Sequence, residues 1–590
     1  MNLLIAALLL CCSVLLTLAQ SEPQVAVLNG TYEGVHLPSF NQDAFLGIPY
    51  AQDAGGQNRF RIPQALNETW SDIRSAKNYS HACPDNNPTS DAIYGMSENC
   101  LSINLVRPAG LDSNIKLPVM LWIHGGSYQV GTSGLARYNL SYIVERSVDI
   151  GRPIIGASIN YRKGGWGNMY SIEIQGTGNT NIALRDMRQA LAWISENLAA
   201  FGGDPDTVTI WGESSGSFAV GQLLLSYGGR TDGLFHRSIQ ESGSAATAWY
   251  NGTEWYQPIY DDIVSNVNCS DAVDTLACLR TVPYDVIYPY LNSSTLINGG
   301  PGWYPTVDGD IVPMFPTKTL HSGKFASSVP HLYGSNTDEG TDNAPPNGII
   351  NTDEDLFSYL LNNTGFALPE FAVRRIMELY PDDPAVGIPA NTGTRFDEHG
   401  YQYKRIAAIL GDAFYHATRL DDARSYTEFA SGDSKTYTYR FNTRAWVNGT
   451  NATYTDTIGG FAPEYKGVAH ASEIAFVFNN PEWVGPWAGY TELKNLMSEL
   501  WINFAYDGNP NGAFNRSYAV GAATDAVPQT LDTVNVTGLE RPFWPAYDED
   551  SRGLNLVLQT QGQGGCYIET DTYRLDGREY LSQWARRRHV

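Results

Sequence analysis

The sequence predicts an α/β protein built around a large, mostly parallel sheet flanked by helices. Two apolar runs, residues 117–123 and 153–160, are typical of strands that are buried on both faces. Residues 181–201 have the amphipathic pattern of a helix, and a short β-branched run, residues 208–211, follows them. A strand, a helix and another strand in this order favour parallel strands joined by right-handed crossovers.

The last of these runs leads into a G-x-S-x-G pentapeptide, Gly212 to Gly216, ahead of an apolar segment that suits a helix packed on a sheet. In a strand–turn–helix context the glycines allow a tight turn that raises the Ser214 hydroxyl off the sheet. The start of the helix leaves unpaired N–H groups near any negative charge that develops there. The pentapeptide alone is ambiguous, because 57 glycines among 590 residues make chance matches common.

The N-terminal residues 1–19 are apolar and end in the small residues that precede a signal-peptidase cut. We predict a secretory signal peptide cleaved after Ala19, although no Lys or Arg precedes the apolar run. A membrane anchor is the less favoured alternative, because the run is short for a bilayer span. No later stretch of the sequence reads as a transmembrane segment. Residues 20–590 contain neither an internal repeat nor a low-complexity linker and are predicted to form one domain.

The remaining elements are predicted from apolar runs, periodicity and turn residues. Asn29-Gly30 is expected to join residues 25–28 and 32–37 as a hairpin. Residues 250–328 are expected to form an irregular excursion. Further strands are expected at 238–243, 329–334 and 436–441, and helices within 354–430, over 487–504 and just before Trp584.

Cysteines and glycosylation sequons are typical of a secreted glycoprotein. Local pairing predicts the disulfides Cys83–Cys100 and Cys269–Cys278 and leaves Cys566 free. The N-x-S/T sequons are Asn29, Asn67, Asn78, Asn139, Asn251, Asn268, Asn292, Asn362, Asn448, Asn451, Asn515 and Asn535.

Composition and missing motifs exclude several classes of function. A net charge of −24 would repel a polyanion, so nucleic acid is not an expected partner. The sequence contains no C-x-x-C, H-E-x-x-H, G-x-G-x-x-G or P-loop pattern. We therefore expect no metal and no organic cofactor.

A serine nucleophile needs a base, and the base needs an orienting acid. In the strand–turn–helix arrangement the expected chain order is Ser, then Asp or Glu, then His. Glu339 follows the predicted strand 329–334, and Asp338 beside it is the main competitor for the role of acid. Among the later histidines, His470 lies in a loop before an apolar run, which suits a base that reaches over a sheet edge. The other candidates are His399, His416 and His589.

Acyl transfer also needs donors for the oxyanion of the tetrahedral intermediate. The backbone N–H of Ser215, next to the nucleophile, is one candidate. The glycine-containing loop His124 to Ser127 follows a predicted strand and can supply the others, because glycine lets the backbone approach a substrate closely.

Many short motifs together resemble the type B carboxylesterases, a family that includes cholinesterases and secreted fungal lipases. The resemblance covers nearly the whole mature chain. Within the family, the chain looks most like the secreted fungal members. Its motifs are Phe45 to Tyr50, Arg59-Phe60, Ser97 to Leu101, Trp122 to Gly126, Asn160 to Arg162, Asn181 to Asp186, Phe201 to Pro205, Gly212 to Gly216, Glu241 to Ser244, Asp338 to Gly340, and His470 with Glu473-Ile474.

The resemblance implies an α/β-hydrolase fold and assigns roles to matching residues. It implies Ser214 as nucleophile, His470 as base and Glu339, rather than Asp338, as acid. It implies an oxyanion hole formed by Gly126, Ser127 and Ser215, a buried polar support at Ser242, the two disulfides above, and ion pairs Arg59–Glu98 and Arg162–Asp186.

Two positions and one loop depart from the family pattern. Ser127 stands where a third glycine is usual, and Ser215 replaces the commoner alanine, but both changes keep the amide N–H. The loop between Cys83 and Cys100 is short and polar, whereas the family's lipases carry an apolar lid helix there. We therefore expect a weakly lidded site with little interfacial activation.

These observations predict a secreted serine carboxylic-ester hydrolase that acts through an acyl-enzyme on a small-molecule or lipid ester. A lipase or sterol esterase acting on long-chain esters is the alternative. A non-catalytic binding protein of the same fold is the less favoured reading, because all three triad positions are occupied. The sequence gives no indication of the oligomeric state.

Overall fold

The computed structural model describes residues 22–111, 115–291, 302–345, 348–362, 368–390, 392–447, 460–513, 535–547 and 553–587. The predicted signal peptide and His589 lie outside the described residues. The same holds for the sequons Asn292, Asn448, Asn451 and Asn515.

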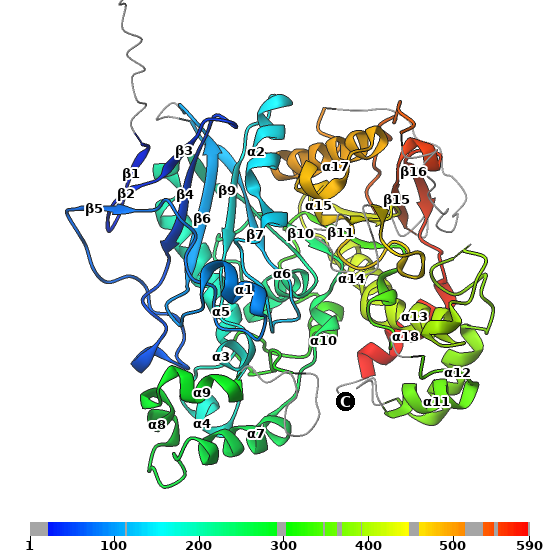
Figure 1. Ribbon diagram of the computed structural model, residues 1–590, viewed down its shortest axis with the longest axis horizontal. Coiled ribbons are helices and arrows are strands. Elements are labelled where there is room, and N and C mark those ends of the chain that lie inside the picture. Colours follow the sequence, from blue (N-terminus) through cyan, green and yellow to red (C-terminus); the bar gives the residue numbers. More distant parts are fainter. Residues whose placement is uncertain are drawn as a thin grey trace, which may run out of the picture.

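An eleven-stranded sheet forms the centre of the molecule, in the order β16-β15-β12-β11-β10-β9-β7-β8-β6-β4-β3 (Figure 1). Neighbouring strands are parallel from β8 through β7, β9, β10, β11 and β12 to β15, and antiparallel at both edges. The predicted large, mostly parallel sheet is confirmed. Its strands are β3 (Val35–Leu37), β4 (Gln42–Pro49), β6 (Ser102–Pro108), β7 (Leu117–Ile123), β8 (Ile155–Ile159), β9 (Gly203–Glu213), β10 (Arg237–Glu241), β11 (His331–Asn336), β12 (Thr436–Phe441), β15 (Leu554–Leu558) and β16 (Tyr567–Thr570).

The sheet carries a hydrophobic core on each face, because the side chains of a strand alternate between its two sides. In β7, Leu121 faces the core that contains α5 (Ile182–Asn197) and α6 (Ser215–Leu225). Its neighbour Trp122 faces the other core, against α2 (Leu140–Asp149) and α17 (Ala488–Asp507). Helix α6 is buried along its whole length, which explains why its sequence is apolar on every side.

Outside the large sheet, β1 (Gln24–Val27) and β2 (Gly30–Glu33) form the predicted hairpin. The second predicted strand is broken, however, and β3 leaves the hairpin to pair with β4 at the edge of the large sheet. The remaining short strands are β5 (Ile73–Ser75), β13 (Trp446–Val447) and β14 (Gly460–Phe461).

The expectation that residues 250–328 are irregular is wrong. They contain four helices among the described residues, and Figure 1 shows three of them, α7, α8 and α9, grouped near α4. Pro258 and Pro289 lie inside α7 and α9, although proline disfavours the interior of a helix. The four helices are α7 (Thr253–Asn266), α8 (Thr275–Thr281), α9 (Tyr284–Leu291) and α10 (Pro316–His321).

The other helices follow the expected regions. Residues 354–430 are mostly helical, as predicted, and Figure 1 shows α11, α12, α13 and α18 gathered at one end of the molecule. Among the described residues we find no helix whose length and hydropathy would carry it across a bilayer. The remaining bounds are α1 (Pro88–Tyr94), α3 (Gly164–Asn168), α4 (Ile172–Gly176), α11 (Asp353–Asn362), α12 (Glu370–Leu379), α13 (Tyr403–Gly411), α14 (Ala417–Glu428), α15 (Ile474–Val477), α16 (Pro481–Val484) and α18 (Leu575–Arg587).

The predicted cross-links are present. Disulfides join Cys83 to Cys100 and Cys269 to Cys278, and Cys566 is free. Arg59 pairs with Glu98 at 2.7 Å, as the family resemblance implied.

The second implied ion pair is buried and carries a stability prediction. Nη2 and Nε of Arg162 lie 2.6 and 2.8 Å from the carboxylate oxygens of Asp186, which is fully buried. Replacing Arg162 by Met leaves that carboxylate without its partner, so we expect a loss of about 3–5 kcal/mol of unfolding free energy in urea denaturation.

A matched control is Arg374→Met, which removes an equally short pair with Glu370 on the surface of α12, where both side chains are 63% exposed. Exposed pairs of this kind contribute about 0–1 kcal/mol. Equal losses of unfolding free energy in the two variants would contradict the prediction that the buried pair matters more for stability than the exposed one.

Candidate active site

Ser214 occupies the sharp turn between β9, which ends at Glu213, and α6, which begins at Ser215. Its backbone has φ 57° and ψ −127°, a conformation that residues other than glycine rarely adopt. Its N–H donates to the carbonyl of Glu241 at the end of β10, at 3.0 Å, which fixes the turn to the sheet. A Cβ at Gly216 would lie 2.0 Å from the carbonyl oxygen of Ile123, so only glycine fits there. The strand–turn–helix context expected of the pentapeptide is present.

His470 and Glu339 are brought together from distant parts of the chain. Nδ1 of His470 lies 2.6 Å from Oε2 of Glu339, which follows β11 and is fully buried. The other oxygen of Glu339 accepts hydrogen bonds from the Asn336 N–H at 2.7 Å and from the hydroxyl of Ser242. The carboxylate is therefore held in place on one side and bound to the imidazole on the other.

The competing candidates have other partners. Asp338 accepts a hydrogen bond from the Val468 N–H at 2.8 Å and so fixes the loop before His470 rather than the imidazole itself. His416 shares a hydrogen bond with the hydroxyl of Ser335 at 3.0 Å, and the His399 ring packs on Tyr465 with 3.9 Å between centroids.

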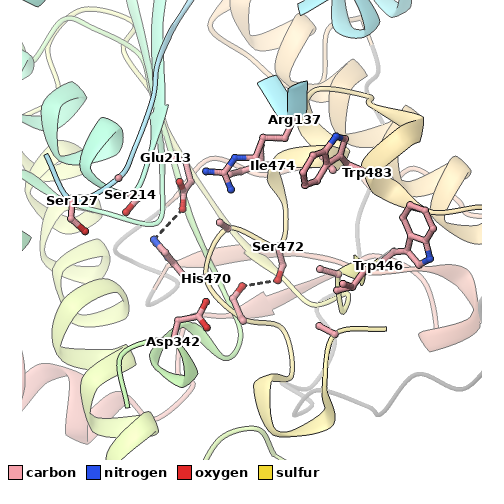
Figure 2. A pocket seen from close by; sticks show the side chains of 17 residues that line it. Ser127, Arg137, Glu213, Ser214, Asp342, Trp446, His470, Ser472, Ile474 and Trp483 are labelled. Carbon is pink, nitrogen blue, oxygen red and sulfur yellow. Dashed lines mark hydrogen bonds and ion pairs between the residues drawn. The ribbon is translucent and has the colours of Figure 1, made fainter. Parts of the chain in front are cut away.

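The second nitrogen of His470 faces Glu213, a contact that the sequence analysis did not anticipate. Nε2 lies 3.1 Å from Oε1 of Glu213, and Figure 2 shows this ion pair beside Ser214. Within the described part of the chain, Nε2 has no partner in hydrogen-bonding geometry, and Ser214 is therefore not bonded to it. The ring also packs against Tyr415, with 4.7 Å between centroids. The imidazole thus lies between two carboxylates, one at each nitrogen.

This arrangement shifts two pKa values. Burial lowers the pKa of His470, but attraction by Glu213 and Glu339 outweighs burial and raises it to about 10. Burial raises the pKa of Glu213 despite the attraction of His470 and Arg137. In this conformation the structure therefore favours a protonated imidazole.

Two further carboxylates, Glu473 and Glu241, are buried and close enough to Glu213 to interact with its charge. Glu473 accepts a hydrogen bond from the Asn336 side chain at 2.6 Å, and Glu241 accepts one from the Trp501 indole at 2.7 Å. Burial and the charges of Glu213 and Glu339 raise the pKa of Glu473 to about 8. At neutral pH these effects favour the uncharged form of Glu473, which limits the negative charge around the imidazole.

A cavity of about 310 Å³ contains Ser214 and His470 (Figure 2). Gly126 and Ser127 of the loop that follows β7 belong to its lining. The other lining residues are Arg137, Glu213, Asp342, Ala445, Trp446, Val447, Ala462, Ala469, Ala471, Ser472, Ile474, Ala475 and Trp483.

The loop after β7 closely approaches the serine. A Cβ at Gly125 would lie 2.9 Å from Cβ of Ser214, so glycine is needed at this point. The Tyr128 N–H donates to the Ser215 hydroxyl at 3.0 Å, which ties the loop to the first turn of α6. Ser215 is the first residue of α6, so its own N–H has no partner within the helix. The three residues expected to form an oxyanion hole therefore lie around Ser214.

The loop between Cys83 and Cys100 contributes no residue to the described lining of the cavity. It contains the short helix α1, and the Tyr94 hydroxyl donates to the carbonyl of Gly134. Among the described residues, His, Cys, Asp and Glu form no group that could hold a metal ion.

A model of the carboxylesterase family matches residues 21–563. The chain belongs to the carboxylesterase family. It is 29% identical to secreted lipase 1 of Botryotinia fuckeliana, an alignment that covers 96% of this chain and 92% of the relative. The crystal structure of Aspergillus niger EstA superposes with a TM-score of 0.76 and 25% identity over 97% of this chain and 99% of that one. These matches confirm the predicted α/β-hydrolase fold and identify the protein as a carboxylic ester hydrolase.

A third relative, from Byssochlamys spectabilis, is named inactive carboxylesterase-like protein VdtD. It is also 29% identical and the alignment covers 83% of each chain. Membership of the family therefore does not by itself assign the catalytic residues of this chain.

Proposed function

We propose that this carboxylesterase is a secreted enzyme that cleaves esters through a Ser214–His470–Glu339 triad and an acyl-enzyme. The observation that carries the proposal is the 2.6 Å contact between Glu339 and His470, which lines the cavity that also contains Ser214 on its strained turn. A nucleophile, a base and an orienting carboxylate are the parts that acyl transfer by serine requires.

In the proposed reaction, Oγ of Ser214 attacks the ester carbonyl while Nε2 of His470 takes the hydroxyl proton. Glu339 accepts the hydrogen bond from Nδ1 and stabilises the imidazolium that forms. The amides of Gly126, Ser127 and Ser215 are the proposed donors to the oxyanion. Collapse of the intermediate expels the alcohol, which takes its proton from Nε2. Water then attacks the acyl-enzyme by the same route and releases the acid.

This cycle requires Nε2 to exchange Glu213 for the Ser214 hydroxyl. Glu213, Ser214 and His470 line the same cavity, so we propose that side-chain rotations make this exchange. Glu213 therefore has two expected effects: it pairs with the imidazolium and it holds the resting imidazole away from the serine.

The Glu213 contact predicts the pH dependence of turnover. The reaction starts with a neutral imidazole, so kcat/KM should rise with pH through the pKa of His470. Because Glu213 raises that pKa, Glu213→Gln should lower it and shift the rising limb of the pH–kcat/KM profile toward acid by about one pH unit or more. Profiles of the two proteins with a neutral ester test this, and a shift toward alkali or none would contradict the proposed pairing.

Secretion is proposed from the N-terminal segment that ends at Ala19, and similarity to a relative named as a secreted lipase supports it. Edman sequencing or mass spectrometry of the N-terminus of protein recovered from medium tests this step. A mature chain that starts at Gln20 is expected. An intact residue 1–19 segment on membrane-bound protein would contradict it.

Between a carboxylesterase and an interfacial lipase, we propose the carboxylesterase. The loop between Cys83 and Cys100 is polar and contributes no residue to the described lining of the cavity, which favours a site without an apolar lid. We expect nitrophenyl esters of short and medium acids to be hydrolysed without a rate jump above their solubility limit. The similarity to a lipase favours the alternative, which predicts a triglyceride emulsion as the better substrate. Failure to hydrolyse any of these esters would support the non-catalytic reading.

A further inference from the structure

Arg137 lies in the cavity of the proposed triad, although no motif marks it in the sequence. It belongs to a single 3-10 turn, Ala136–Tyr138, between β7 and α2. Its side chain lines the same cavity as Ser214 and His470. Figure 2 shows the guanidinium reaching into the space between Glu213 and Trp483.

The guanidinium is anchored by a tyrosine rather than by a carboxylate. Nη2 donates to the Tyr138 hydroxyl at 2.6 Å, and the guanidinium carbon lies 4.7 Å from the centroid of the Tyr138 ring. Among the described residues, Arg137 takes part in no ion pair, and its buried Nε has no hydrogen-bond partner. Arg137 is half-buried, and the loss of water at its Nε is costly for a charged group that has no anion in contact.

The other charged groups of the cavity have their own partners in direct contact. Asp342 pairs with Lys466 at 2.7 Å, and Glu213 pairs with His470 at 3.1 Å. Arg137 is thus the cation of the described lining that has no anion in contact. It also keeps its charge: burial lowers its pKa, but Tyr138 and Glu213 raise it, and the net shift is upward.

Planar guanidinium and carboxylate groups fit each other in a two-point geometry, which makes arginine the usual receptor for an organic acid. Around Arg137 the cavity offers two tryptophans, Trp446 and Trp483, and otherwise mostly small apolar side chains. A ligand that satisfies all of these groups has a free carboxylate next to an apolar or aromatic body.

Building on the proposed esterase function, we infer that Arg137 binds a carboxylate of the substrate and that the enzyme acts preferentially on esters that carry a free acid group. The rival explanation is that Arg137 only balances the charge of Glu213. That role would affect charged and neutral esters alike, because it acts on the catalytic groups and touches no part of the substrate.

The test compares matched esters in the wild type and in Arg137→Gln. The acid may sit in either half of the ester, so two pairs are used: 4-nitrophenyl hydrogen adipate against 4-nitrophenyl hexanoate, and 4-acetoxybenzoate against 4-methylphenyl acetate. The measured quantity is the ratio of kcat/KM for the acid over that for the neutral ester. We expect Arg137→Gln to lower this ratio about 10- to 100-fold for at least one pair, the usual range for a charge-assisted contact.

Two further variants separate a direct contact from a general charge effect. Arg137→Lys keeps the charge but loses the planar guanidinium that can bind both oxygens of a carboxylate. Its ratio should therefore lie between those of the wild type and Arg137→Gln. Arg374→Gln removes the same charge from the exposed surface of α12 and should leave the ratio unchanged. An unchanged ratio in Arg137→Gln, with both esters of each pair falling together, would overturn the inference.

An equilibrium measurement keeps this test independent of the triad. Free adipate and benzoate are titrated calorimetrically into Ser214→Ala and into the double variant with Arg137→Gln. The inference predicts that at least one of the two anions binds about 10-fold or more weakly to the double variant, and equal binding of both would contradict it. If the wild type hydrolysed no ester at all, the proposed function would fail, and the calorimetric result would still decide the role of Arg137.

Discussion

Replacing Ser214 by Ala is expected to lower kcat/KM for a neutral nitrophenyl ester by about ten thousand- to a million-fold. The hydroxyl is the atom proposed to form the acyl-enzyme, whereas the hydroxyl of the neighbouring Ser215 accepts the Tyr128 N–H. The change removes one oxygen from a residue whose backbone hydrogen bonds remain available, so the fold should persist. Steady-state kinetics, with circular dichroism and thermal unfolding as checks, measure the effect.

The matched control for this variant is Ser215→Ala, which removes the adjacent hydroxyl. Ser215 contributes its backbone N–H to the proposed oxyanion hole, and alanine keeps that group. Its hydroxyl accepts the Tyr128 N–H, so we expect some loosening of the loop and a loss of activity of about tenfold or less. Comparable losses in both variants would contradict the assignment of Ser214 as the nucleophile.

The second large effect is expected for Glu339→Gln, with a loss in kcat of about a hundred- to ten thousand-fold. A glutamine amide can donate a hydrogen bond to Nδ1 of His470, which places the ring proton on Nε2. The imidazole then cannot accept the proton of Ser214. The charge that stabilises the imidazolium is lost as well, and this loss falls on kcat because the charge develops only during the reaction.

Asp338→Asn is the matched control for the adjacent position. Asp338 is buried and accepts the Val468 N–H, but it does not contact the imidazole. We expect the control to lower thermal stability while kcat stays within about tenfold of the wild type, since it leaves the His470–Glu339 contact intact. A larger kcat loss in Asp338→Asn than in Glu339→Gln would transfer the role of acid to Asp338.

The parts of the fold that the sequence predicted best are those whose local pattern and burial agree. Residues 117–123 are apolar throughout and residues 436–441 are β-branched or aromatic except for Arg440, and both became strands with the predicted bounds. By contrast, β15 and β16 were not anticipated. Asn555, the second residue of β15, is buried, and its side-chain N–H donates to Glu569 of β16 at 3.0 Å, so this donor has its partner only once the two strands pair.

The candidate site also contains residues that the sequence predicted and residues that it did not. Chain order and motifs pointed to Ser214 and His470, but only the family resemblance distinguished Glu339 from Asp338, because both follow the same strand. The structure shows their different partners. The contact of Glu213 with His470 could have been suspected, since Glu213 belongs to the pentapeptide. No sequence pattern pointed to Arg137, because the position of its side chain in the cavity depends on the path of the loop between β7 and α2.

The measurement that tests the account most directly is a crystal structure of the enzyme after reaction with a 4-nitrophenyl alkylphosphonate. The account predicts phosphorus bonded to Oγ of Ser214 and a phosphonyl oxygen about 3 Å from the amides of Gly126, Ser127 and Ser215. It also predicts that Nε2 of His470 has turned from Glu213 toward the serine. A phosphonate attached to another residue, or no covalent adduct with full esterase activity retained, would contradict it.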